Sequence, residues 1–66
     1  MHKYKIGDIV YYCNEEGKYK CEILNLWNLI YQLKYPTYQI KLLEHVPKYN
    51  YIVKMIVPEN ALENIG

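Results

Sequence analysis

Apolar and polar residues alternate with a period of two along much of this chain, which indicates half-buried β-strands. In residues 18–24, Tyr19, Cys21 and Ile23 share one face, and charged side chains share the other. We therefore expect strands at residues 9–13, 18–24, 37–44 and 49–57, and a short closing strand at residues 62–65. The predicted core comprises Val10, Tyr19, Cys21, Ile23, Ile40, Leu42, Val53, Val57 and Leu62.

The first two strands are expected to form a hairpin around a turn at residues 14–17. In that hairpin Cys13 faces about Tyr19, and Cys21 faces about Tyr11. The two sulfur atoms then lie diagonally, whereas a disulfide needs Cβ atoms about 3.8 Å apart. We expect two separate, reduced thiols.

Residues that constrain the backbone occur before the first predicted strand and after the fourth. Gly7 tolerates a positive φ, and Asp8 is expected to bond nearby backbone amides and fix the start of the first strand. Residues 1–5 are polar, and we expect them to fray. Pro58 ends the fourth strand, and residues 59–61 form one tight turn that returns the chain to the interior.

Residues 25–36 contain two competing patterns. Helical spacing at i, i+3, i+4 and i+7 is found at Leu26, Leu29, Ile30 and Leu33. Residues that suit an extended hairpin equally well are Trp27, Ile30, Tyr31 and Tyr35. We favour a short helix or helical turn that starts near Asn25 and ends before Tyr35, because Pro36 disfavours helix at the preceding residue.

The composition limits the size and partners of the protein. The 66 residues make one domain, and nine tyrosines without phenylalanine supply most of the aromatic bulk. Eight basic and seven acidic residues give a net charge of +1, without arginine, which disfavours nucleic-acid binding through phosphate contacts. The favouring of Lys, Asn, Ile and Tyr is typical of AT-rich coding, in a bacterium or its phages.

The residues that carry chemistry form no recognised catalytic pattern. There is no nucleophile–base pair, phosphate-binding loop or paired acid, so we expect no enzyme activity and no cofactor. Cys13, Cys21 and His45 lack the spacing of a zinc site, so we expect no metal. No signal peptide and no apolar run of about 20 residues is present, which predicts a cytoplasmic protein without membrane contact.

Four short motifs span nearly the whole chain: GDIV at residues 7–10, GKYKCEI at residues 17–23, YQIK at residues 38–41 and VPENAL at residues 57–62. Together they resemble the SH3-like barrel superfamily, especially its Tudor-type members. The resemblance implies a mainly β fold: one small five-stranded SH3-like barrel over residues 1–66, with a short helical or loop insertion between the second and third strands.

Tudor-type domains often hold methylated side chains in an aromatic cage by cation–π attraction. Tyr12 and Tyr19 match positions of cage walls, and the resemblance makes them a candidate aromatic pocket. The alternative is that both rings simply pack in the core or at its rim.

The segment after the second strand adds more apolar surface than one small barrel can cover. We therefore predict a non-enzymatic binding module that contacts another protein, either its own copy or a host target, as a phage or mobile-element accessory protein does. The predicted contact residues are Trp27, Leu29, Ile30, Tyr31, Leu33 and Tyr35. The alternatives are a lid over the barrel end, single-stranded nucleic-acid binding through aromatic residues with Lys18, Lys20, Lys41 and Lys54, and a ligand-sequestering oligomer.

Overall fold

The computed structural model describes residues 2–27, 36–45 and 54–65. Its strands are β1 (Ile9–Asn14), β2 (Gly17–Trp27), β3 (Thr37–Leu42), β4 (Lys54–Pro58) and β5 (Leu62–Asn64). All pairings are antiparallel, and one short 3₁₀ turn, η1 (Glu59–Ala61), precedes β5. The mainly β prediction is confirmed.

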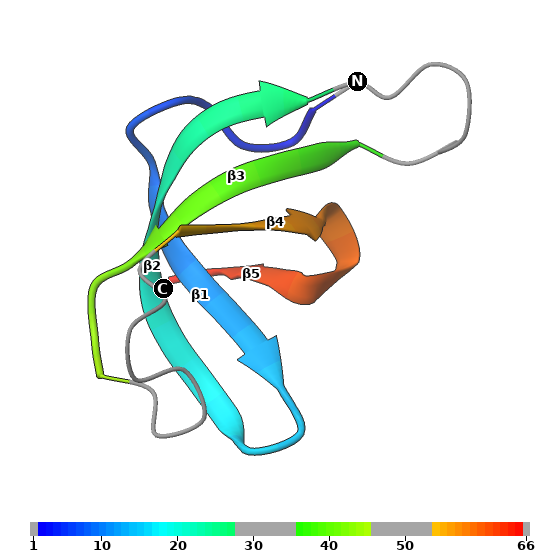
Figure 1. The fold of residues 1–66 in the computed structure, drawn as a ribbon. Coiled ribbons are helices and arrows are strands. Elements are labelled where there is room, and N and C mark those ends of the chain that lie inside the picture. The colour runs from blue at the N-terminus through cyan, green and yellow to red at the C-terminus, as the bar shows by residue number, and fades with distance from the viewer. Residues whose placement is uncertain (1, 28–35, 46–53, 66) are drawn as a thin grey trace.

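The strands form a single sheet in the order β4-β3-β2-β1-β5 (Figure 1). Strands β1 to β4 follow one another as neighbours, whereas β5 lies beside β1 at the opposite edge from β4. The turn η1 therefore connects the two edges of the sheet. The sheet is curved but is not closed into a barrel, since β4 pairs with β3 and β5 pairs with β1 among the described residues.

The β1–β2 hairpin turns on two residues, with Asn14 directly opposite Gly17. The Asn14 side-chain oxygen accepts hydrogen bonds from the backbone N–H groups of Glu16, at 2.8 Å, and Gly17, at 3.1 Å. Gly17 has a φ of 150°, a value that L side chains rarely adopt. This loop is one residue shorter than expected, so the predicted pairing of Cys13 with Tyr19 is wrong by one position.

The corrected register separates the two cysteines. Cys21 lies opposite Val10 and faces the core, whereas Cys13 lies opposite Lys18 on the other face of the sheet. Directly paired residues point to the same side of a sheet, and odd and even positions alternate. Both thiols are free, as expected, and they lie on opposite faces.

The core lies on one face of the sheet, which we call the inner face. Predicted core residues that are buried are Val10, Cys21, Ile23, Ile40, Leu42, Val57 and Leu62. Tyr19 is half-buried against this cluster, and Val53 lies outside the described residues. Three further tyrosines, Tyr4, Tyr12 and Tyr38, are also buried, so aromatic rings fill much of the interior.

The segment before β1 is docked onto the sheet. Tyr4 is only 3% exposed, and the backbone N–H groups of Lys3 and Tyr4 donate to the Tyr38 hydroxyl at 2.9 and 3.2 Å. The backbone N–H of Gly7 donates to the carbonyl of Ile23 at 2.8 Å. The predicted fraying is wrong for the described part of this segment, because a buried phenol satisfies its backbone donors.

The Gly7–Asp8 prediction is confirmed. Gly7 has a φ of 94°, and the Asp8 carboxylate accepts a hydrogen bond from the backbone N–H of Lys5 at 2.9 Å. The Asp8 N–H donates to the Lys5 carbonyl at 3.0 Å, which closes a small loop. This loop directs the chain into β1.

Strand β2 runs three residues further than predicted. Residues 25–27 pair with β3, after a register shift between Ile23 and Asn25, and are therefore extended rather than the first turn of a helix. The Asn25 side-chain amide donates to Gln39 at 2.7 Å, which adds a side-chain contact to this pairing. The rest of the predicted insertion, and the predicted part of the fourth strand before Lys54, lie outside the described residues.

Candidate functional site

We call the face of the sheet opposite the core the outer face. It carries most of the exposed side chains of the strands. The pairing register arranges its residues in rows across the strands. One row is Trp27, Thr37 and Pro58, the next is Asn25, Gln39 and Ile56, and a third is Ile9, Glu22, Lys41 and Lys54. Residues in one row are direct cross-strand neighbours.

The end of the outer face where β2 and β4 carry their last residues is apolar. Trp27 is 41% exposed and Ile56 is 56% exposed, and the two lie in adjacent rows on this face. Leu26 is also exposed, but its pairing with Tyr38 places it at the margin of the inner face. We call Trp27, Ile56 and Pro58 the apolar end.

Lysines are also concentrated on the outer face. The four strand lysines, Lys18, Lys20, Lys41 and Lys54, all fall there by register. Strand acids at outer positions are Glu22 and Glu63, whereas Glu15 and Glu16 lie in the hairpin turn. The outer face of the sheet therefore carries more basic than acidic strand residues, although the net charge of the whole chain is only +1.

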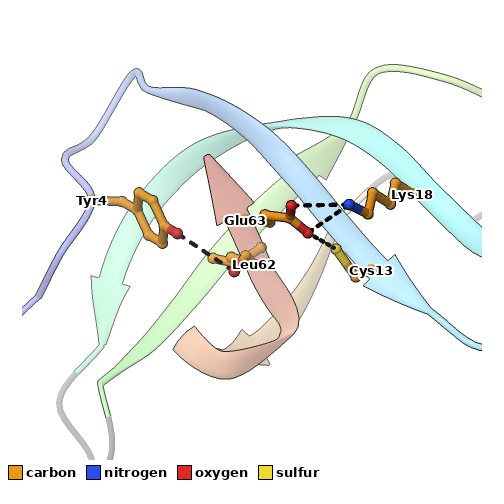
Figure 2. A network of polar contacts seen from close by, with 5 residues as sticks. All are labelled: Tyr4, Cys13, Lys18, Leu62 and Glu63. Atoms are coloured by element: carbon orange, nitrogen blue, oxygen red, sulfur yellow. Dashed lines mark hydrogen bonds and ion pairs between the residues drawn. The ribbon is translucent and has the colours of Figure 1, made fainter. Parts of the chain in front are cut away.

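One of these lysines is already paired. The Lys18 ammonium contacts the Glu63 carboxylate at 2.9 Å, and the Cys13 thiol donates to the same carboxylate at 3.5 Å (Figure 2). The hydrogen bond from Lys18 lowers the pKa of Glu63, whereas burial and then Glu63 raise the pKa of the Cys13 thiol. This cluster joins β5 to the β1–β2 hairpin, and its cysteine is not activated as a nucleophile.

A second polar cluster lies at the docked N-terminal segment. The Tyr38 hydroxyl donates to the Glu59 carboxylate, and the backbone N–H of Lys3 donates to the same carboxylate oxygen at 2.8 Å. Burial, followed by the hydrogen bond to Glu59, raises the pKa of Tyr38 from 10.0 to about 12. The same bond lowers the pKa of Glu59.

A shallow pocket of about 290 Å³ adjoins this cluster. It is lined by Lys3, Tyr4, Pro36, Glu59, Asn60 and Leu62. The Tyr4 hydroxyl donates to the Leu62 carbonyl at 3.4 Å (Figure 2), and the Lys3 ammonium lies 5.4 Å from the centre of the Tyr4 ring. The polar groups of Lys3, Tyr4 and Glu59 bond to one another, to Tyr38 and to Leu62, so these contacts join the N-terminal segment to β3, η1 and β5.

The predicted contact residues are only partly described. Trp27 is exposed, whereas Leu29, Ile30, Tyr31, Leu33 and Tyr35 lie outside the described residues. Tyr12 and Tyr19, the candidate aromatic pocket, are direct neighbours across the hairpin on the inner face. Tyr12 is 8% exposed and Tyr19 is half-buried, and both rings pack with the core.

Ile56 is an exposed outer-face residue that is not among the predicted contact residues. Its signal in the sequence was the presence of apolar side chains on both faces of the predicted fourth strand, which indicates that one face meets something other than solvent. The pairing of Ile56 with Gln39 now places it on the outer face near Trp27. The register was needed to connect the two residues.

Across residues 2–27, 36–45 and 54–65, no three His, Cys, Asp or Glu side chains gather in a way that could hold a metal ion. That same part of the chain contains no helix long and apolar enough to cross a membrane. Comparison with protein-family models, curated proteins and solved structures finds no match.

Proposed function

We propose that this protein is a non-enzymatic binding module that contacts another protein through the apolar end of its outer face. The observation that supports the proposal is the exposure of Trp27 and Ile56 in adjacent rows of one sheet face. Tryptophan is among the residues that dominate interface energetics, and exposed apolar side chains gathered on one face are typical of contact sites. The other predicted contact residues, Leu29, Ile30, Tyr31, Leu33 and Tyr35, lie outside the described residues and remain part of the proposal.

For the fold, we propose an SH3-like barrel with a short helical or loop insertion between the second and third strands. The strand order supports it, because η1 links the two edges of a curved five-stranded sheet and brings the chain back to β1. The module is proposed to act in the cytoplasm of a bacterium, or as a phage or mobile-element accessory protein. This setting rests on the composition alone.

The proposed partner is a different protein rather than a second copy. A two-fold symmetric dimer places the same patch of both subunits face to face. Two outer faces would then bring the lysines of one copy, such as Lys41 and Lys54, near those of the other. Like charges across an interface are unfavourable, so this face suits a partner of different charge.

The test is affinity purification from cells that express the tagged protein, with Trp27→Ala and Leu43→Ala as matched variants. Leu43 is 45% exposed and follows β3 at its other end, so it controls for the loss of any exposed apolar side chain. The partner is then purified, and its affinity for each variant is measured. Trp27→Ala should weaken binding by about 2 kcal/mol or more, with Leu43→Ala near wild type.

Two controls decide the result. Circular dichroism must show that Trp27→Ala keeps the β spectrum, and light scattering after size exclusion must show a monomer. Equal binding by wild type and Trp27→Ala contradicts the proposal. A stable dimer that Trp27→Ala dissociates shows self-association in place of a different partner.

A second candidate is single-stranded nucleic-acid binding. It is favoured by one observation, the placement of four strand lysines and Trp27 on the same face. Bases stack on exposed aromatic rings while lysines follow the backbone. Titration with oligo(dT) at several salt concentrations tests it, and sub-micromolar affinity that falls steeply with salt would place this function first.

A further inference from the structure

Lys41 on β3 and Lys54 on β4 are direct cross-strand neighbours on the outer face. Both side chains are exposed. Cβ atoms of such pairs lie about 4.5–5.5 Å apart, and like charges at that spacing destabilise a sheet. The two lysines therefore repel each other in the free protein.

Within the described chain, no acid forms an ion pair with either lysine. The ion pair formed there joins Lys18 to Glu63, at the other end of the face. Glu22 is the direct neighbour of Lys41 on β2 and offsets part of the repulsion, but it forms no ion pair with Lys41 and lies two strands away from Lys54. The Glu44 carboxylate accepts a hydrogen bond from the backbone N–H of Lys20 at 2.6 Å.

The lysine pair adjoins the apolar end. Ile56 lies two residues after Lys54 on β4, so both side chains point to the same face. Gln39 connects the two rows, because it pairs with Ile56 and lies two residues before Lys41 on β3. Positive charge and an exposed aliphatic side chain thus form one continuous surface.

From this juxtaposition we infer that the partner is an acidic polypeptide segment whose carboxylates contact Lys41 and Lys54 while an apolar side chain packs on Ile56. The inference rests on the proposed function and specifies the chemistry of the partner. Carboxylates relieve the repulsion between the lysines, so binding gains energy that the free protein lacks. The residue next to the lysine pair is aliphatic, which favours an apolar side chain of a polypeptide there, because base stacking uses aromatic rings and Trp27 lies one row further from the lysines.

The test uses a labelled peptide in which glutamates flank one leucine and one tryptophan, with a glutamine version of the same peptide and oligo(dT) as comparisons. Binding is followed by amide chemical shifts of the protein. The glutamate peptide should shift the amides of Lys41, Lys54 and Ile56 more strongly than the glutamine peptide does. No shift at these positions, or equal shifts by both peptides, overturns the inference.

A charge reversal separates binding from folding. Lys54→Glu should weaken binding of the glutamate peptide by about threefold or more. It should also raise the melting temperature by about 2–6 °C, because it converts repulsion with Lys41 into attraction. The control is Lys5→Glu, which makes the same change in net charge at an exposed position before β1. Equal weakening by both variants means that net charge alone governs binding and overturns the inference.

Two further outcomes distinguish the competing ideas. If the purified partner depends on Trp27 but binds the Lys54→Glu variant as tightly as wild type, the proposed function stands and the acidic partner is wrong. If oligo(dT) shifts the same amides with higher affinity than the glutamate peptide, the lysine pair binds nucleic acid instead. A partner that requires neither Trp27 nor Lys54 contradicts both proposals.

Discussion

The hydroxyl of Tyr38, on the central part of the sheet, donates a hydrogen bond to the carboxylate of Glu59 in the turn between β4 and β5. The same hydroxyl oxygen accepts hydrogen bonds from the backbone N–H groups of Lys3 and Tyr4. One buried phenol therefore joins three parts of the chain that are distant in sequence. The N-terminal segment and the edge-linking turn both depend on it.

Replacing Tyr38 with Phe should destabilise the fold by about 1–3 kcal/mol, because the Tyr4 N–H loses its acceptor and the Lys3 N–H keeps only the Glu59 carboxylate. Urea unfolding monitored by circular dichroism measures the change. Tyr11→Phe is the matched control, since Tyr11 is half-buried on the outer face, and a shift within about 0.5 kcal/mol is expected there. Equal stability of the Tyr38→Phe variant and wild type would show that the hydrogen bonds of the Tyr38 hydroxyl make no net contribution to the free energy of unfolding.

Stability should fall at both ends of the pH range. The pKa of Glu59 is lowered in the folded protein, so its contribution is complete above its ordinary value of 4.5 and is lost as pH falls through the folded value. The pKa of Tyr38 is raised to about 12, so its contribution is complete below 10 and is lost as pH rises toward 12. Burial raises the pKa of Cys21 to about 11, which adds to the alkaline loss.

Melting temperatures recorded from pH 3 to pH 12 measure this profile. Glu59→Gln should reduce the acid-side dependence, and Tyr38→Phe should reduce the alkaline dependence while leaving the part due to Cys21. A melting temperature that stays flat from pH 9 to pH 12 would contradict the assigned environment of Tyr38.

Ile23 and Ile56 should respond differently to truncation. Ile23 is fully buried, so Ile23→Ala should cost about 2–5 kcal/mol by loss of buried methyl groups and creation of a cavity. Ile56 is 56% exposed, and Ile56→Ala should change the free energy of unfolding by at most about 0.5 kcal/mol. Chemical denaturation of both variants tests the assignment of inner and outer faces, and similar losses would refute it.

The two cysteines should label as independent thiols. Alkylation of the native protein without reductant is expected to modify Cys13 slowly, because its pKa is raised, and to leave the buried Cys21 unmodified. After unfolding, mass spectrometry should show two labels. A mass two units lower, with no labelling, would be incompatible with thiols on opposite faces.

The approximate positions and the buried faces of the strands could be predicted from the sequence, because side chains that alternate between core and solvent give a period of two. This period placed Cys21, Ile23, Ile40 and Leu42 in the core, where the structure has them. The hairpin register could not be read with the same certainty, because two- and three-residue loops both fit the turn residues. A shift of one residue exchanges the faces of paired side chains, as the cysteines show.

The docking of the N-terminal segment could not be predicted from the sequence, for a different reason. Residues 2–5 are polar on average, and the partner of Tyr4 lies on β3, far along the chain. One residue of the outer face could be predicted, since Trp27 was selected from its residue type and from the surplus of apolar residues in the segment after the second strand. The pairing of Lys41 with Lys54 required the register between β3 and β4, which no local pattern supplies.

The position of β5 beside β1 also determines when the protein can fold during its synthesis. The β1–β2 hairpin involves neighbours in sequence and can form while the ribosome is still translating the chain. The other edge of β1 stays open until residues 62–64 have left the exit tunnel, because no other described strand pairs with it. A nascent chain stalled before Leu62 would present that open edge to other chains, a situation in which chaperone capture or aggregation competes with folding.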